Sequence, residues 1–167
     1  MEIDTIGFLS KSRNAICDGT AVQVEASQLG YCRFYYAENS FMYTNTYMGK
    51  SKFAGQETIY KNGFPVWIMN YIGRLIDREN FARDFLEEAL LCERKDFPFR
   101  GPSRYIIGDH SYRCNINGGF KWFCGYEEQY LKRHKVFECA FHGGDIDRKK
   151  LLKEWKMSAG SWDRDSE

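Results

Sequence analysis

The sequence predicts an α+β fold built as a tandem duplication, in which a unit of one helix and a four-stranded antiparallel sheet occurs twice about a pseudo-twofold axis. Three observations predict it: a self-match at an offset of seventy residues, hairpin turns between alternating apolar runs, and an apolar helical stripe before each set of strands. The chain has 167 residues, which is the length of one domain that folds without metals or disulfides.

The self-match aligns residues 35–76 with residues 105–146 without a gap. Ten of the 42 aligned positions are identical, where about three are expected from average composition. The identical pairs are Tyr35/Tyr105, Asn45/Asn115, Gly49/Gly119, Phe53/Phe123, Gly55/Gly125, Glu57/Glu127, Tyr60/Tyr130, Val66/Val136, Gly73/Gly143 and Ile76/Ile146. The alternative is that any two aromatic-rich hairpins align this well when the best offset is chosen.

A helix is expected before each set of strands. The first covers residues 5–17 with Asp4 as its N-cap, and the second covers residues 81–90 with Asn80 as its N-cap. A longer loop is expected over residues 18–30. The apolar stripes consist of Ile6, Leu9 and Ile16 in the first helix and of Phe81, Ala82, Phe85, Leu86, Ala89 and Leu90 in the second.

Eight strands follow from the alternating apolar runs. Their expected ranges are 31–37, 41–47, 53–61, 65–73, 103–107, 111–116, 120–131 and 134–142. The sequence thus predicts one globular domain over residues 1–157, with repeat halves at about 5–76 and 80–146, a C-terminal helix over residues 147–157 and a flexible tail over residues 158–167.

Composition limits the partners and the compartment. Lys and Arg number 24 against 23 for Asp and Glu, so bulk charge does not favour binding to nucleic acid or to a membrane. The N-terminus has no signal-peptide pattern and no apolar run is long enough to span a bilayer, so a cytoplasmic location is expected. The six cysteines are expected to be reduced, and their spacing indicates neither a metal site nor a cofactor.

The Asn62-Gly63 turn predicts the register of the hairpin that contains it, and the register predicts two faces. We assign Trp67, Met69 and Tyr71 to the core face under the helices. The opposite face is then expected to carry polar groups among apolar residues, beside glycines that let a ligand approach the backbone. These polar groups are Glu57, Asn70, Glu127, Glu138 and His142.

Each polar residue on that face also has a structural interpretation. Glu138 is read as a solvated side chain on the wet face of a sheet, whereas Glu57 lies among apolar neighbours and needs a partner. His142 is more often a structural histidine than a base. Arg100 lies on the link between the two halves, where structural pairing is expected first and anion binding second. The candidate ligand-binding residues are Glu57, Asn70, Glu127 and His142.

Four runs carry a resemblance to a known family: residues 53–57, 65–73, 99–102 and 141–144. With them, residues 6–146 resemble an uncharacterised bacterial family that is named only as a domain of unknown function. The resemblance implies a domain that occurs alone or behind a helix-turn-helix head of the phage-repressor kind. No such head fits before residue 5, so no direct binding to nucleic acid is expected.

Three classes of function fit these observations. The first is a small-molecule binding module, with a sensor as one form of it, because carboxylates among aromatic rings suit a cationic or aromatic ligand. The second is a hydrolase or lyase that uses Glu57 or Glu127 with His142, although no catalytic motif supports an enzyme. The third is a protein-interaction or inhibitor domain without a small-molecule site. The sequence carries no sign of the oligomeric state.

Overall fold

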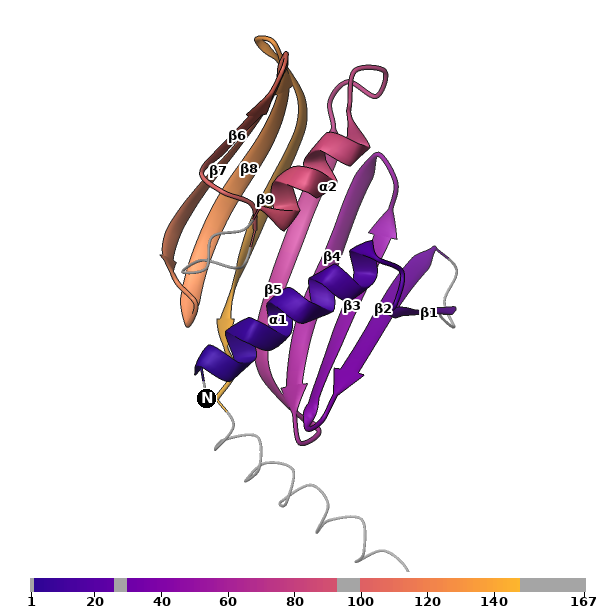
Figure 1. The fold of residues 1–167 in the computed structure, drawn as a ribbon, viewed down its shortest axis with the longest axis vertical. Coiled ribbons are helices and arrows are strands. Elements are labelled where there is room, and N and C mark those ends of the chain that lie inside the picture. The colour runs from indigo at the N-terminus through magenta and orange to yellow at the C-terminus, as the bar shows by residue number, and fades with distance from the viewer. Residues whose placement is uncertain (1, 26–29, 93–99, 148–167) are drawn as a thin grey trace, which may run out of the picture.

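The computed structural model describes residues 2–25, 30–92 and 100–147, and these form two helices and nine strands (Figure 1). The helices are α1 (Glu2–Cys17) and α2 (Arg83–Leu91). The strands are β1 (Val22–Glu25), β2 (Tyr31–Glu38), β3 (Phe41–Gly49), β4 (Lys52–Lys61), β5 (Phe64–Leu75), β6 (Arg104–Ile107), β7 (His110–Gly119), β8 (Trp122–Leu131) and β9 (His134–Asp145).

The eight expected strands are confirmed, each to within three residues at either end. The turns between them are confirmed as well. Asn62 and Gly63 have φ values of 52° and 78°, which is the left-handed region that a two-residue hairpin turn of the primed type requires. Local alternation and turn chemistry therefore placed the strands correctly.

The helices differ from the expectation at their first residues. Asp4 lies inside α1, which already begins at Glu2, and is not its N-cap. The N-cap of α2 is Ala82, whose side chain makes no capping hydrogen bond. Asn80 instead donates from its side chain to Asp77 Oδ2 at 2.8 Å, within the turn that follows β5. The loop expected over residues 18–30 contains the short strand β1, which pairs with β2.

The expected fold class is wrong. All nine strands form a single antiparallel sheet in the order β1-β2-β3-β4-β5-β9-β8-β7-β6, so the chain does not consist of two units that each have a helix and a separate four-stranded sheet. Strands β5 and β9 pair with each other over nine residues, from Trp67 opposite Asp145 to Leu75 opposite Phe137. This pairing gives each strand a hydrogen-bonding neighbour at the edge that the expected arrangement left open.

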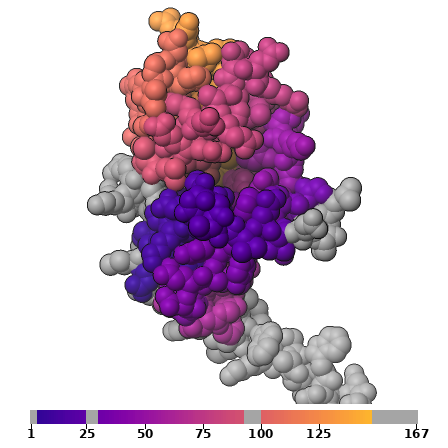
Figure 2. Space-filling model, turned by 45° about the vertical axis from the view of Figure 1, so that its right-hand side comes forward, coloured from indigo at the N-terminus to yellow at the C-terminus, as the bar shows by residue number. Residues whose placement is uncertain are grey.

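Both described helices lie on one face of the sheet, which we call the helix face (Figures 1 and 2). Helix α1 contributes Phe8 and Leu9 to the core, and α2 contributes Phe85, Leu86 and Ala89. The sheet side chains beneath them are largely aromatic, and their central member is Trp67. They include Tyr43, Ile59, Trp67, Met69, Tyr112, Phe123, Phe137, Cys139 and Phe141. We call the other face of the sheet the open face, since no described helix covers it.

The expected assignment of side chains to the two faces is partly wrong, because the β4–β5 hairpin and the β8–β9 hairpin each contain a β-bulge. Tyr60 pairs with Pro65 as expected, but Ile59 pairs with Trp67, so Val66 is an extra residue on β5. Val136 is the extra residue at the matching place on β9. The carbonyl of Val66 accepts a hydrogen bond from Ile146 N at 3.1 Å, and that of Val136 accepts one from Ile76 N at 2.8 Å. Each bulge is thus held by the end of the neighbouring central strand.

The C-terminal helix expected over residues 147–157 and the tail over residues 158–167 fall outside the described residues, except for Asp147. The expected boundary of the domain at residue 157 stays a prediction. Within the described residues, no helix combines the length and the apolar character that crossing a membrane requires.

Trp67 and Trp122 offer a matched pair for testing the core. Trp67 is fully buried, donates from Nε1 to the Phe120 carbonyl at 3.0 Å and stacks on Phe120, whereas Trp122 is 82% exposed. We expect Trp67→Ala to lower the free energy of unfolding by about 3–5 kcal/mol through the cavity it leaves. Trp122→Ala should change it by less than about 0.5 kcal/mol. Urea denaturation of both variants measures the difference, and equal losses would contradict the assignment of faces.

Candidate functional site

The structure divides the four predicted ligand-binding residues between the two faces. Glu57 pairs with Met69, and Glu127 pairs with Cys139, so both carboxylates lie on the helix face. Asn70 and His142 are direct cross-strand partners on the open face. The expectation that the four share one face is wrong, because the bulges at Val66 and Val136 shift the partner strands by one residue and a shift of one residue exchanges the faces.

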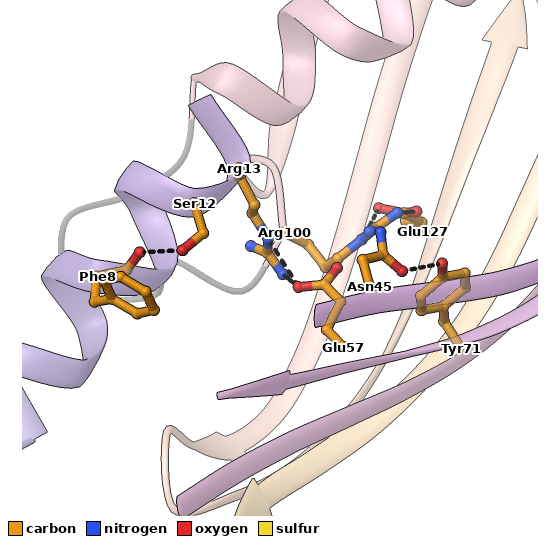
Figure 3. Close-up of polar contacts among 8 residues, drawn as sticks. All are labelled: Phe8, Ser12, Arg13, Asn45, Glu57, Tyr71, Arg100 and Glu127. Atoms are coloured by element: carbon orange, nitrogen blue, oxygen red, sulfur yellow. Dashed lines mark hydrogen bonds and ion pairs between the residues drawn. The ribbon is translucent and has the colours of Figure 1, made fainter. Parts of the chain in front are cut away.

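Glu57 is held by an arginine from α1. Glu57 is 3% exposed, and its Oε2 accepts hydrogen bonds from Arg13 Nε at 3.1 Å and Arg13 Nη2 at 2.9 Å (Figure 3). This two-donor contact satisfies the partner that the sequence required for a buried Glu57. The contact also joins α1 to β4, since Arg13 lies in the last part of the helix and Glu57 lies near the middle of the strand.

Glu127 has the same kind of partner, in a more buried setting. Its side chain is fully buried and accepts hydrogen bonds from Arg100 Nε at 2.9 Å and from Arg100 Nη2 (Figure 3). It also accepts one from the Tyr112 hydroxyl at 2.6 Å. Burial lowers the pKa of Arg100, but the charge and hydrogen bonds of Glu127 outweigh it and raise the pKa above its ordinary value. Arg100 is therefore a structural partner, which is the first of the two roles expected for it.

Two tyrosine hydroxyls and the Asn45 amide lie near Glu57. The Tyr71 hydroxyl donates to Asn45 Oδ1 at 2.8 Å, and Asn45 is the cross-strand partner of Glu57 (Figure 3). The Tyr43 hydroxyl is fully buried and makes no hydrogen bond within the described part of the chain. Burial, followed by the nearby charge of Glu57, raises the pKa of both tyrosines well above the ordinary value, so they remain neutral donors at physiological pH.

Two buried thiols flank Glu127 on its neighbouring strands. Cys114 pairs with Glu127 across β7 and β8, and Cys139 pairs with it across β8 and β9. Burial raises the pKa of Cys114 to about 11 and that of Cys139 to about 12, with the charge of Glu127 adding to both. Both remain thiols at neutral pH, which makes them unreactive side chains of the core. All six cysteines are free in the structure.

The glycines beside the two carboxylates leave no room for a ligand. A Cβ atom on Gly55 would collide with the Tyr71 ring, and one on Gly125 would collide with the Phe141 ring. Each glycine therefore makes space for an aromatic ring of the next strand, and the expectation that a ligand approaches the backbone there loses its support. The helix-face carboxylates have structural roles in these contacts, and the ligand-binding role expected of them stays a prediction.

The open face carries a groove with a volume of about 840 Å³, which we call the open-face groove. Its floor lies on β4, β5 and β9, and its walls come from the start of β2, the end of β3 and β8. The lining residues are Gly30, Tyr31, Met48, Gly49, Lys52, Phe53, Ala54, Ile72, Gly73, Arg74, Tyr126, Glu138 and Ala140.

The groove follows from a row of apolar side chains across the sheet. Cross-strand pairing joins Met48 to Ala54, Ala54 to Ile72, Ile72 to Ala140, and Ala140 to Tyr126. The two alanines are the smallest of these side chains, so the surface is hollow where they lie and high at Met48 and Tyr126. Ile72 is 64% exposed, which is unusual for a large apolar side chain on a central strand.

A row of charged side chains borders the groove on one side. Pairing joins Lys52 to Arg74, Arg74 to Glu138, and Glu138 to Glu128. Glu138 accepts from Arg74 Nε at 2.6 Å, from the Tyr126 hydroxyl, and from Lys135 Nζ at 2.7 Å. Hydrogen bonds from Lys135 and Tyr126, with a smaller one from Arg74, lower the pKa of Glu138 to about 2. We call Lys52, Arg74, Glu138 and Glu128 the charged row.

A polar row borders the groove on the other side and contains both remaining candidates. His142 has Asn70 as its partner on β5 and Cys124 as its partner on β8. Gln56 Nε2 donates to Asn70 Oδ1 at 2.9 Å. Asn70, Cys124 and His142 line a second depression of about 400 Å³, which shares Ile72 and Ala140 with the open-face groove. The structure thus brings Asn70 and His142 together next to the groove.

A comparison with protein-family models matches residues 45–146 to a domain of unknown function (DUF5680). The chain belongs to the DUF5680 family. The resemblance to an uncharacterised domain family is therefore confirmed, while a bacterial origin and fusion to helix-turn-helix heads stay predictions. The DUF5680 match contains both buried carboxylates and every residue of the open-face groove except Gly30 and Tyr31. Neither the curated proteins nor the solved structures gave a significant match.

The sequence patterns of this DUF5680 chain contain signals for residues that the sequence prediction did not include, namely Arg13 and the residues of the open-face groove. Arg13 lies on the same helical stripe as Leu9 and Ile16, and a charged residue on a buried stripe indicates a buried partner. The groove residues gave a weaker signal, namely the small side chains of Ala54 and Ala140 on two expected strands. No group of three or more potential metal ligands occurs in the described ranges.

Removal of one buried charge tests the structural role of the DUF5680 carboxylates. We expect Glu127→Gln to lower the free energy of unfolding by about 3–5 kcal/mol, because Arg100 is left buried without its counter-charge. Glu57→Gln should cost about 2 kcal/mol, because Arg13 is more exposed. Glu38→Gln, which removes an exposed pair with Lys11, is the control and should cost less than about 1 kcal/mol. Equal effects in urea denaturation would argue against this ranking.

The charged row predicts a loss of stability in acid. The folded state lowers the pKa of Glu138 from 4.5 to about 2, so its contribution is present above about 4.5 and is lost as the pH falls toward 2. We expect Glu138→Gln to be less stable than the wild type at pH 6 and the difference to shrink on acidification. Thermal melts between pH 6 and pH 2.5 measure it. A difference that stays constant over this range would contradict the assignment.

Proposed function

We propose that this chain is a small-molecule-binding module whose site is the open-face groove. The observation that carries the proposal is the groove itself, a concave surface of about 840 Å³ with a mainly apolar lining and a few polar groups at its margin. Ligand sites have volumes of about 300–1,000 Å³ and this kind of lining, in which apolar walls supply affinity and a few polar groups set the orientation.

The rigidity of the floor supports the same function. The groove lies over β4, β5 and β9, which are inner strands of the sheet and are hydrogen-bonded on both sides. On the other face, the same strands carry the paired carboxylates and the aromatic core. A site on such a floor changes little when a ligand binds, so little of the binding energy is spent on ordering the protein.

The enzymatic alternative has less support. A hydrolase or lyase that uses Glu57 or Glu127 with His142 requires the carboxylate to reach the imidazole. In this fold the two kinds of residue lie on opposite faces of one sheet, and both carboxylates are engaged by arginines. The neighbours of His142 in the sheet are Asn70 and Cys124 instead. A protein-interaction role for the open face is the remaining alternative, and the test below separates it from small-molecule binding.

Several expectations from the sequence belong to this proposal. They are a sensing role, a bacterial source, a cytoplasmic location and the absence of direct contact with nucleic acid. A ligand-binding domain that regulates a separate or fused DNA-binding head would combine them. The groove supports the ligand-binding part of that combination, and the other parts rest on the sequence alone.

Ala140 and Ala37 provide a matched pair of variants for testing the site. Both are exposed alanines on the open face, but only Ala140 lines the groove. We expect the neutral fluorescent probe 1-N-phenylnaphthylamine to bind the wild type, and Ala140→Trp to weaken binding at least about tenfold by filling the groove. Ala37→Trp should leave the affinity unchanged. Fluorescence titration measures all three proteins.

Two results would count against the proposal. Unchanged affinity in Ala140→Trp would place the probe elsewhere on the molecule. Failure of the wild type to bind the probe, together with self-association that Ala140→Trp abolishes, would favour the interaction domain. Thermal melts of both variants confirm that a change in affinity is not a loss of folding.

A further inference from the structure

We propose that the ligand of the open-face groove is an amphipathic carboxylate, with its apolar body along Ala54, Ile72 and Ala140 and its anionic group between Lys52 and Arg74. This inference rests on the proposed function and adds the chemical class of the ligand. It follows from the charges of the row that borders the groove, counted partner by partner.

Lys52 is the first part of the argument. Its side chain is exposed at the start of β4, and it makes no hydrogen bond or ion pair with any residue in the described ranges. Its direct cross-strand partner is Arg74, on the same face. Two like charges directly opposite one another destabilise a sheet, and an anion between them removes that cost. The groove therefore has two cations at one margin without an anion between them.

Arg74 has hydrogen-bond donors without a partner among the described residues. Its Nε and Nη2 atoms both contact the same oxygen of Glu138, Oε1, at 2.6 Å. The Nη1 atom, with its two hydrogens, has no partner among the described residues. The Arg74 side chain is 57% exposed, and Arg74 lines the groove. Because a guanidinium presents its donors in a planar fork that matches a carboxylate, the free side of Arg74 suits an anionic group.

Glu138 cannot serve as the counter-ion of Lys52 or as the receptor of a cation. Its Oε1 accepts from Arg74, and its Oε2 accepts from both Tyr126 and Lys135. Lys135 also holds Glu128 at 2.9 Å. Lys52, Arg74 and Lys135 thus face two carboxylates, and the positive charge in excess is that of Lys52. The electrostatic balance at the groove favours an anion.

This inference differs from the cationic ligand that the sequence suggested. That expectation depended on Glu57 and Glu127 lying among aromatic rings at a binding surface. Both carboxylates are instead neutralised by Arg13 and Arg100 on the helix face. The two buried carboxylates are therefore not available to a ligand of the groove. Lys52 and Arg74 lie at the margin of this apolar groove instead.

Three ligands with one alkyl chain and different head groups test the inference: dodecanoate, dodecanol and dodecyltrimethylammonium. The two charged ligands are titrated into the full chain below their micelle concentrations and dodecanol below its solubility limit, with displacement of 1-N-phenylnaphthylamine and isothermal calorimetry as readouts. We expect dodecanoate to bind about five- to tenfold more tightly than dodecanol, and the cation to bind most weakly. The advantage of dodecanoate should decrease at high salt, because its head group lies at the exposed margin.

Lys52→Gln and Lys50→Gln are the matched variants. Both lysines are exposed in or beside the turn between β3 and β4, but only Lys52 lines the groove. We expect Lys52→Gln to lower the affinity for dodecanoate several-fold toward that for dodecanol, with Arg74 retaining part of the preference, and to leave the affinity for dodecanol unchanged. Lys50→Gln should alter neither. Since Lys52 has no partner in the described ranges, its replacement should not destabilise the fold.

The outcomes separate this inference from the proposed function. If dodecanol binds the wild type as tightly as dodecanoate, or if Lys52→Gln keeps the preference undiminished, the anionic class is wrong while the groove remains a binding site. If neither dodecanoate nor the neutral probe binds the wild type, both proposals are wrong.

Discussion

The antiparallel pairing of β5 with β9 is the constraint on which the rest of this structure depends. It joins two sets of strands into one sheet and makes β5 and β9 inner strands. Without it, β5 and β9 would each present a long row of unpaired backbone groups. The bulges at Val66 and Val136 belong to the same arrangement, because their carbonyls accept hydrogen bonds from the residues that follow the ends of β9 and β5. The pairing therefore decides both which strands form the floor of the groove and which side chains face it.

The two faces of the sheet have different roles, because the charged side chains are buried and paired on one face and partly solvated on the other. On the helix face, Glu57 and Glu127 are buried and bound by arginines from segments far away in the chain, so their energetic role is to fix α1 and the segment before β6 on the sheet. A buried charge that loses its partner is costly, which makes these contacts specific. On the open face, the charges lie at the margin of an apolar surface and remain partly solvated. Charges of that second kind can accept a ligand, since a ligand displaces water from them at low cost.

The proposed ligand class follows from this division. Aromatic rings on the helix face occupy the space above Gly55 and Gly125, so the candidate binding surface is on the other side, where Ala54 and Ala140 leave room. Lys52 and Arg74 then give that surface a positive margin. The polar row with Asn70 and His142 lies on the opposite side of the same groove, which leaves hydrogen-bonding groups available for a second polar feature of a ligand.

The sequence by itself determined the elements that depend on neighbours along the chain. Alternating apolar residues and the Asn62-Gly63 turn gave the strands of the β4–β5 hairpin, and the apolar stripe gave α2 apart from its first residues, because these signals are local. The single sheet, the faces of Glu57 and Glu127, and the arginines that bind them were decided by the tertiary structure. A bulge of one residue reverses every face beyond it, and the pairing of β5 with β9 joins residues about seventy positions apart, so neither leaves a local pattern to read. The sequence could name Glu57, Asn70, Glu127 and His142, but only the fold could show that they lie on opposite faces of one sheet.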